Sequence, residues 1–326
     1  LEHYTIALAL ADRAREGVSV TLLLEGQAVA TAGGISDQER WACQQVEEAG
    51  GACWFMFYSD TLRIYDRYTY IHSKALRIDG QWALISSQNP TGGGMPGDDK
   101  ADGTWGSRGV LLWTNAPGVV ERLGAILDAD LDLSHRDLTR WDPANPYGYG
   151  LPPAGFQPLV ATGGTTSTVH FPAPLVTAGT YGFELLTAPE SALRRSDALL
   201  GLLQRAGAGD TVLVEQMYEY GDWGTMPDGA PAPNPRLEAY IAAARRGARV
   251  RILLNAGSFG MAYRSRRMPQ RSSMPTTWPT ARGWTCRCTW PTPPGTASTA
   301  SWCWPRSTAW AMPTSAASTA ANPPAR

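Results

Sequence analysis

The sequence predicts an α/β protein of two tandem α/β/α domains related by a pseudo-twofold duplication, with the second domain incomplete. The stretch 15–25 aligns without a gap to 245–255, 230 residues further along the chain. Each copy reads as an Ala- and Arg-rich helix, a Gly suited to a left-handed helix cap, and an apolar strand. A stretch rich in Pro, Gly and Thr, 145–180, lies between the copies and is expected to be a linker.

The first domain is expected to span residues 1–144. Residues 1–15 read as a helix already under way, so any signal peptide would precede Leu1. The continuous apolar run that follows predicts a strand buried on both faces, as strands in α/β sheets are. A closing amphipathic helix is expected at 117–131.

The second domain is expected to span residues 181–262. A helix at about 192–206 and a strand at 211–218 should precede its copy of the repeat. If the 230-residue offset holds for this helix and this strand, their equivalents in the first domain would lie before residue 1. We therefore expect the first domain to lack its opening strand; the alternative is that the two halves simply differ.

Bulk composition narrows the function classes. The 326-residue chain is 43% hydrophobic and 17% charged, which is typical of soluble globular proteins. Its formal net charge of -1 gives no overall attraction to a polyanion, so nucleic acid is not the expected partner. No apolar run approaches the about 18 residues of a spanning helix, which leaves peripheral membrane contact or secretion open. Cys43 and Cys53 could pair or stay free, and they do not fix the compartment.

A hairpin is predicted inside 68–89. Asp79-Gly80 between two strand-like runs is a strong signal for a two-residue type I′ turn, which needs positive φ at both positions. An Asp before Gly is also what such a turn prefers for purely structural reasons. If Ile78 faces Gln81, the whole register of the hairpin follows.

That register brings chemistry-bearing side chains together. It places His72 opposite Ser87, with Asn89 two residues further along the same strand. Lys74 shares a strand face with His72 for the same reason. A basic nitrogen, a cation, a hydroxyl and an amide then converge on a volume that suits a phosphate group.

The spacing of these residues resembles the motif of the phospholipase D superfamily, including cardiolipin synthase-like members. The matching residues are His72, Lys74 and Asp79, followed by the tetrad 86–89. The family form of the tetrad is Gly-Ser-x-Asn, so Ser86 departs from the pattern where the family has Gly.

The resemblance implies a two-half active site that needs no metal or other cofactor. One histidine, here His72, would attack phosphorus and form a phosphohistidine, while its equivalent in the other half protonates the leaving alkoxide. Lys74 and Asn89 would bind the non-bridging oxygens with help from Ser87, and Asp79 would orient the histidine and keep it basic. The implied substrate is a phosphodiester, foremost a phospholipid.

The second half-site is missing from the chain as written. The repeat predicts a second His-x-Lys near position 302, but 264–326 contains no His, Lys, Asp, Glu, Leu, Ile, Val, Phe or Tyr. The segment holds six of the thirteen tryptophans, which a disordered tail would not favour. We interpret 263–326 as an out-of-frame tail, with the break between Gly260 and Arg266. Residues 298–321 can be encoded by codons that, when read in the shifted frame, give a His-x-Lys and a Gly-Ser-x-Asn.

Three functions follow from this sequence. The leading hypothesis is a two-motif phosphodiesterase that acts on phospholipids by hydrolysis or transphosphatidylation, with the chain as written expected to be inactive. One alternative is a nuclease-like homodimer that builds its site from a single motif per chain. The other is a non-catalytic pseudoenzyme or binding module.

Overall fold

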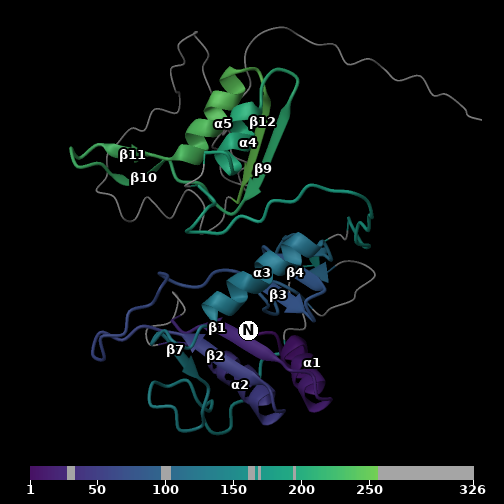
Figure 1. Cartoon of the computed structure of the whole chain (residues 1–326), viewed down its shortest axis with the longest axis vertical. Helices are drawn as coiled ribbons and strands as arrows, with labels where there is room; N and C mark the ends of the chain where they lie inside the picture. The colour runs from purple at the N-terminus through teal and green to yellow at the C-terminus, as the bar shows by residue number, and fades with distance from the viewer. Residues whose placement is uncertain (28–33, 97–103, 161–165, 168–169, 194–195, 256–326) are drawn as a thin grey trace, which may run out of the picture. The chain divides into compact units, whose positions relative to one another are not determined.

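The chain forms a mixed α/β protein with two compact units, Leu1–Leu185 and Leu186–Arg326 (Figure 1). The computed structural model describes residues 1–27, 34–96, 104–160, 166–167, 170–193 and 196–255. The expected out-of-frame tail, 263–326, and the frame-shift hypothesis lie outside the described residues. No helix in the described part is long and apolar enough to cross a membrane.

The first unit contains three helices and eight short strands among its described residues. In chain order they are α1 (Tyr4–Arg15), β1 (Thr21–Glu25), α2 (Asp37–Glu48), β2 (Ala52–Met56), β3 (Ala75–Ile78), β4 (Trp82–Ser86), β5 (Thr104–Trp105), β6 (Leu111–Thr114), α3 (Pro117–Asp130), β7 (Leu138–Arg140) and β8 (Thr166–Ser167). They form three sheets with the strand orders β1-β2-β7, β3-β4-β6 and β5-β8.

The predicted helix, glycine cap and strand at the start of the chain are confirmed. Helix α1 begins after His3, whose Nδ1 accepts a hydrogen bond from the Ile6 amide at 3.3 Å. It ends before Gly17, which has a φ of 92°, a left-handed conformation that glycine adopts without a Cβ penalty. Strand β1 follows and pairs in parallel with β2, at the edge of its sheet.

Helix α2 joins α1 to this sheet. Ser36 and Glu39 form a reciprocal capping box that starts α2. The Tyr4 ring of α1 stacks on the Trp41 ring of α2, with centroids 5.2 Å apart. A disulfide joins Cys43 of α2 to Cys53 of β2, a pairing that the sequence left open.

Two buried hydrophobic clusters stabilise the first unit. One lies on the β1-β2-β7 sheet and one under α3, where α3 covers β3 and β4. The first comprises Ile35, Cys43, Cys53, Phe55, Phe57, Ile64, Trp141 and Tyr149. The second comprises Ala83, Val119, Val120 and Leu123. The expected helix at 117–131 is thus confirmed as α3 and buries one face of the hairpin sheet.

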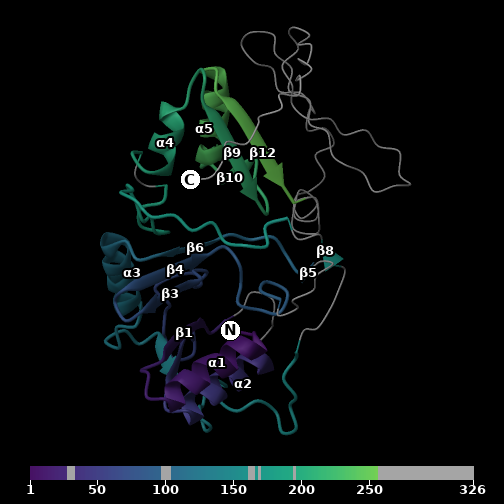
Figure 2. The same ribbon diagram turned by 90° about the vertical axis from the view of Figure 1, so that its right-hand side faces the viewer.

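The second unit is smaller among the described residues. Its elements are α4 (Leu199–Arg205), β9 (Thr211–Gln216), β10 (Asp222–Thr225), β11 (Pro231–Pro233), α5 (Pro235–Arg245) and β12 (Arg249–Leu254). Strands β9 and β12 pair in parallel, and α4 and α5 lie on one side of that pair (Figure 2). Gly247, with a φ of 99°, ends α5 as Gly17 ends α1.

Two sequence predictions about these elements are wrong. The strands were expected to be buried on both faces, but residues alternate between exposed and half-buried along β9 and β12, and Leu213 is 71% exposed. Among the described residues, helices lie on one side of this two-stranded pair only. The helix expected from 192 begins only at Leu199, because the described residues before it, 191–193 and 196–198, form turns.

Candidate functional site

The segment 71–74 carries the expected nucleophile and leads into β3. The Lys74 Nζ donates to the backbone carbonyl of His72 at 2.7 Å, so the ammonium folds back toward the histidine. The Lys74 carbonyl accepts a bond from the Ser86 amide at 2.8 Å, which ties the end of the segment to β4. The exposed His72 ring meets Tyr70 edge to face, with centroids 6.0 Å apart. The structure therefore brings His72 and Lys74 together.

The electrostatics of this pair favour a neutral imidazole beside a cation. Partial burial lowers the pKa of His72, and the charge of Lys74 lowers that pKa further. Partial burial also lowers the pKa of Lys74. A lowered pKa keeps more of the imidazole in the neutral form, which has the lone pair that a nucleophile or base requires.

The turn that follows β4 presents the expected phosphate-binding residues. The Ser86 Oγ accepts from the Gln88 amide at 2.9 Å and donates to the Gln88 carbonyl at 3.1 Å, so it stays within its own turn. The Ser87 Oγ accepts from the Val110 amide at 2.9 Å and keeps a hydroxyl proton to donate. Asn89 is exposed, and its carboxamide has no hydrogen-bond partner among the described residues. Both side chains therefore keep a donor that is not used by the described residues.

The predicted turn is confirmed, but the predicted register is wrong by one residue. Asp79 and Gly80 have φ values of 51° and 62°, as a type I′ turn requires. The Gln81 amide donates to the Ile78 carbonyl at 2.9 Å and closes the turn. The ladder nevertheless pairs Ile78 with Trp82, so Gln81 is an extra residue on its side of the hairpin.

The shifted register changes the residue that lies across from His72. Continuing the ladder past its last pair, Ala75 with Ile85, places His72 across from Gln88 rather than Ser87. A shift of one residue moves a side chain to the other face of a sheet. The expected opposition of His72 and Ser87 is therefore wrong: in this register Ser87 and Asn89 fall on the strand face opposite to that of His72 and Lys74.

Asp79 lies at the tip of the turn, at the end of β3 remote from His72. Six residues separate the two positions, and the four of them that form β3 span roughly 13 Å of extended chain. The left-handed backbone of Asp79 is one that Asp tolerates better than most residues. The structure thus gives Asp79 a role in the turn and does not bring it to the histidine.

Glu25 is a residue of this site that the sequence reasoning missed. It ends β1, and its Oε2 accepts a hydrogen bond from the Ile71 amide at 2.6 Å, directly before His72. The available signal was a polar residue at the end of an apolar strand, since ligands of α/β proteins bind at the carboxyl ends of strands.

A separate depression in the first unit is a weaker candidate. Its volume is about 400 Å³, and it is lined by Glu47, Glu48, Arg140, Trp141, Asp142, Pro143 and Leu151. Arg140 makes a two-pronged pair with Glu47, with Nη2 2.7 Å from Oε2 and Nε 2.9 Å from Oε1. The cation of the depression is therefore already neutralised, and none of the expected site residues lines it.

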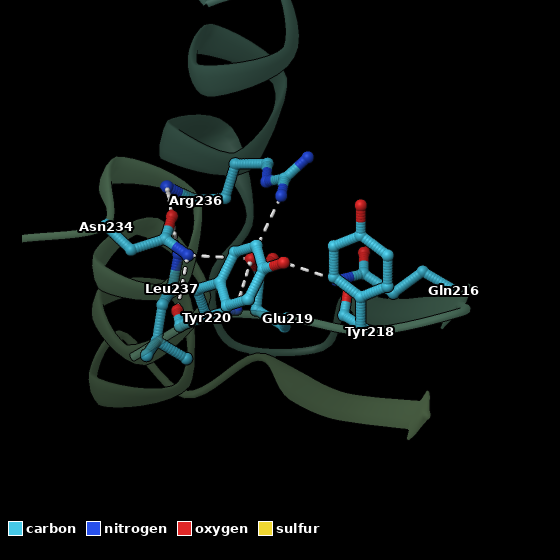
Figure 3. Close-up of polar contacts among 7 residues, drawn as sticks. All are labelled: Gln216, Tyr218, Glu219, Tyr220, Asn234, Arg236 and Leu237. Carbon is cyan, nitrogen blue, oxygen red and sulfur yellow. Dashed lines mark hydrogen bonds and ion pairs between the residues drawn. The ribbon is translucent and has the colours of Figure 1, made fainter. Parts of the chain in front are cut away.

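The second unit holds a dense polar cluster where β9 ends and α5 begins (Figure 3). The carboxylate of Glu219 accepts bonds from Asn234 Nδ2 at 2.7 Å, Arg236 Nη2 at 2.9 Å and Gln216 Nε2 at 2.9 Å. The Asn234 Oδ1 in turn caps α5 by accepting from the Arg236 amide at 3.0 Å. Since its charges pair with one another, we interpret this cluster as a clamp between the loop and the helix.

The clamp should make the second unit sensitive to acid. Burial alone would raise the pKa of Glu219, but the bonds from Gln216, Arg236 and Asn234 outweigh it and lower that pKa below its usual 4.5. An acid whose pKa is lower in the folded state than in the unfolded state stabilises the fold at pH values above its unfolded pKa. That contribution is lost as the pH falls through the folded pKa. Glu219→Gln should lower the free energy of unfolding of the second unit by about 1–3 kcal/mol at pH 7. It should also make the loss of stability below pH 4.5 less steep. The measurement is the protection of the α5 amides from hydrogen exchange at pH 7 and at pH 3, in the wild type and in Glu219→Gln. Parallel changes of protection with pH in the two proteins would contradict the prediction.

Comparison with protein-family models and with curated proteins finds no match to this chain. Within the described ranges, no three His, Cys, Asp or Glu side chains form a group that could hold a metal ion.

Proposed function

We propose that the first unit carries one half-site of a phospholipase D-like phosphodiesterase, and that the two units are tandem domains of this type. The observation that carries the proposal is the Lys74 ammonium held over the His72 carbonyl, beside an imidazole with a lowered pKa. The same hairpin leads to the exposed carboxamide of Asn89 and the hydroxyl of Ser87. His72 and Lys74 supply a nucleophile and a cation for a phosphate, and Ser87 and Asn89 follow on the neighbouring strand as the donors that the resemblance implies.

The chemistry of the half-site is a displacement at phosphorus. A neutral nitrogen of His72 forms a bond to phosphorus, and the bond between phosphorus and the leaving oxygen breaks. Lys74 and Asn89 stabilise the charge on the non-bridging oxygens, with the Ser87 hydroxyl as a further donor. The departing alkoxide of a natural ester needs a proton from a second acid, whereas a nitrophenolate leaves without one. The proposed step uses no metal or cofactor.

Phospholipid is the phosphodiester that the surroundings favour. The face of the β3-β4-β6 sheet away from α3 is apolar and exposed, and Trp82 stacks there on Trp113 with centroids 5.6 Å apart. Leu111 lies on the same face, across from Ser86. Acyl chains or a lipid surface could contact this face next to the half-site, while a chain of net charge -1 offers little to a nucleic acid.

The duplication is supported by the parallel construction of the two units. In each, a helix ends at a left-handed glycine, Gly17 or Gly247, and a strand in a parallel pair follows. The repeat at a 230-residue offset falls on α1–β1 and α5–β12. Strand β12 pairs with β9, whereas β1 has its one partner among the described residues in β2.

A burst experiment tests the proposed function. With bis(4-nitrophenyl) phosphate, we expect one nitrophenolate per chain to be released quickly, without sustained turnover, because the half-site can form the phosphohistidine but lacks a second histidine. His72→Ala should remove the burst, and His135→Ala, a change at an exposed histidine of the same unit, should leave it intact. Sustained turnover that depends on His72 would instead indicate a site built across a homodimer. A folded chain that gives no burst would contradict the proposal and favour a binding role.

A further inference from the structure

Glu25 stands at the place in the first unit where a parallel α/β sheet presents its functional groups. It is the last residue of β1, at the carboxyl end of the parallel pair β1–β2. Its carboxylate is partly buried and makes two bonds to backbone amides. Oε1 accepts from the Gln27 amide at 2.8 Å, and Oε2 accepts from the Ile71 amide at 2.6 Å.

The bond to Ile71 joins parts of the chain that are 46 residues apart. The segment 71–74 lies outside the strand ladder, because β3 begins only at Ala75. Two backbone anchors bracket His72 in the described structure. One is the Glu25 carboxylate on the Ile71 amide, and the other is the Ser86 amide on the Lys74 carbonyl.

The surroundings of Glu25 show that its charge is held there at a cost. Burial raises its pKa, its two backbone hydrogen bonds lower it, and the charges of Asp66 and Glu39 raise it again. The hydroxyl of Tyr149 donates to the Gly26 carbonyl at 2.9 Å, and the charge of Glu25 helps to raise the pKa of Tyr149. A partly buried acid among other acids is an unfavourable choice for packing alone, and such groups concentrate at functional sites.

We propose that Glu25 is a positioning residue of the His72 half-site: its carboxylate fixes the peptide before His72 and so directs the imidazole and the Lys74 ammonium at one phosphate. This inference rests on the proposed function. Glu25 itself is not required to touch the substrate. Without its bond to Ile71, the backbone of segment 71–74 keeps one of these two anchors, the bond to Ser86, and can pivot about it.

Glu25→Gln tests this role with little change in shape. The single carbonyl oxygen of Gln can keep one of the two amide bonds, but its NH2 group cannot accept the other. We expect the rate of the nitrophenolate burst to fall about 10–100-fold, since a displacement of about 1 Å in a reacting group has effects of this size. The burst amplitude, which counts competent folded chains, should not change. Glu48→Gln, at an exposed glutamate of α2, is the matched control and should change neither quantity.

Hydrogen exchange separates positioning from folding. In Glu25→Met, which removes both acceptor oxygens, exchange of the Ile71 amide should accelerate at least about tenfold while the β2 amides keep their protection. An unchanged burst rate, or a loss of amplitude at unchanged rate, would overturn the positioning role and leave the proposed function intact. A wild-type chain without a burst would remove the proposed function and the role of Glu25 with it. Unchanged exchange at Ile71 in Glu25→Met would overturn the anchor itself.

Discussion

Replacing Lys74 with methionine should slow phosphohistidine formation by about 10²–10³-fold, the usual effect of losing one group that stabilises the charge of the transition state. The Lys74 Nζ donates to the His72 carbonyl at 2.7 Å, so its charge is close to the attacking imidazole and to any phosphate bound there. Stopped-flow measurement of the nitrophenolate burst gives the rate directly.

The same substitution should raise the pKa of His72. Burial and the Lys74 charge both lower that pKa, and the methionine variant removes the second cause. Titration of the His72 ring by NMR measures the change. Arg15→Met, which removes a positive charge from an exposed ion pair with Asp12, should alter neither the rate nor the pKa. A burst rate within twofold of wild type, with an unchanged pKa, would contradict the role of Lys74.

Replacing Arg67 with methionine should destabilise the first unit by about 3–5 kcal/mol, because it leaves a buried carboxylate without its cation. Asp137 is 1% exposed, and its Oδ2 accepts from both the backbone amide and the Nε of Arg67, each at 3.0 Å. The same guanidinium donates to the carbonyls of Ala129 and Asp130, at the end of α3.

Urea unfolding followed by hydrogen exchange of β2 amides measures the effect of the Arg67 change. The double variant Arg67→Met with Asp137→Leu should recover part of the loss, since it removes the unpaired charge. Arg136→Met, at an exposed neighbouring arginine, should cost less than about 0.5 kcal/mol. A loss below about 1 kcal/mol in Arg67→Met would show that the pair does not hold this part of the unit.

Local rules were enough to predict the repeated elements. The Ala-rich helix, the capping Gly17 or Gly247 and the strand after it depend on interactions within a few residues, and the structure contains all of them. The burial of the strands could not be predicted this way. Whether one or both faces of β9 are covered depends on how many helices pack there, which the apolar pattern of the strand does not determine.

The register of the hairpin depended on a distant contact. In the expected register, Lys74 would share the α3 face of the sheet with Ala83. The observed register instead places Ala75 on that face and sends Arg77 across Gly124, where a Cβ would meet the guanidinium at 2.9 Å. The contact between Arg77 and Gly124 joins distant parts of the chain, so the local turn signal could not predict it.

The sequence predicted the histidine and lysine of the site but not what holds them. His72 and Lys74 are two residues apart, so their proximity follows from the chain itself. Glu25 reaches the segment only through the fold, because 46 residues separate it from Ile71. Asp79 was expected at the histidine from the resemblance alone, and the extended β3 carries it away. The half-site expected in 263–326 stays a sequence prediction, since it lies outside the described residues.

The central claim is that His72 is a nucleophile toward phosphorus. Its most direct test is to quench the reaction of the full chain with bis(4-nitrophenyl) phosphate at alkaline pH and to locate the adduct by peptide mass spectrometry. We expect a nitrophenyl phosphoryl group on His72, at about one per chain, and none on His135 or His170. An adduct spread over several side chains, or a peptide containing His72 that remains unmodified, would contradict the claim.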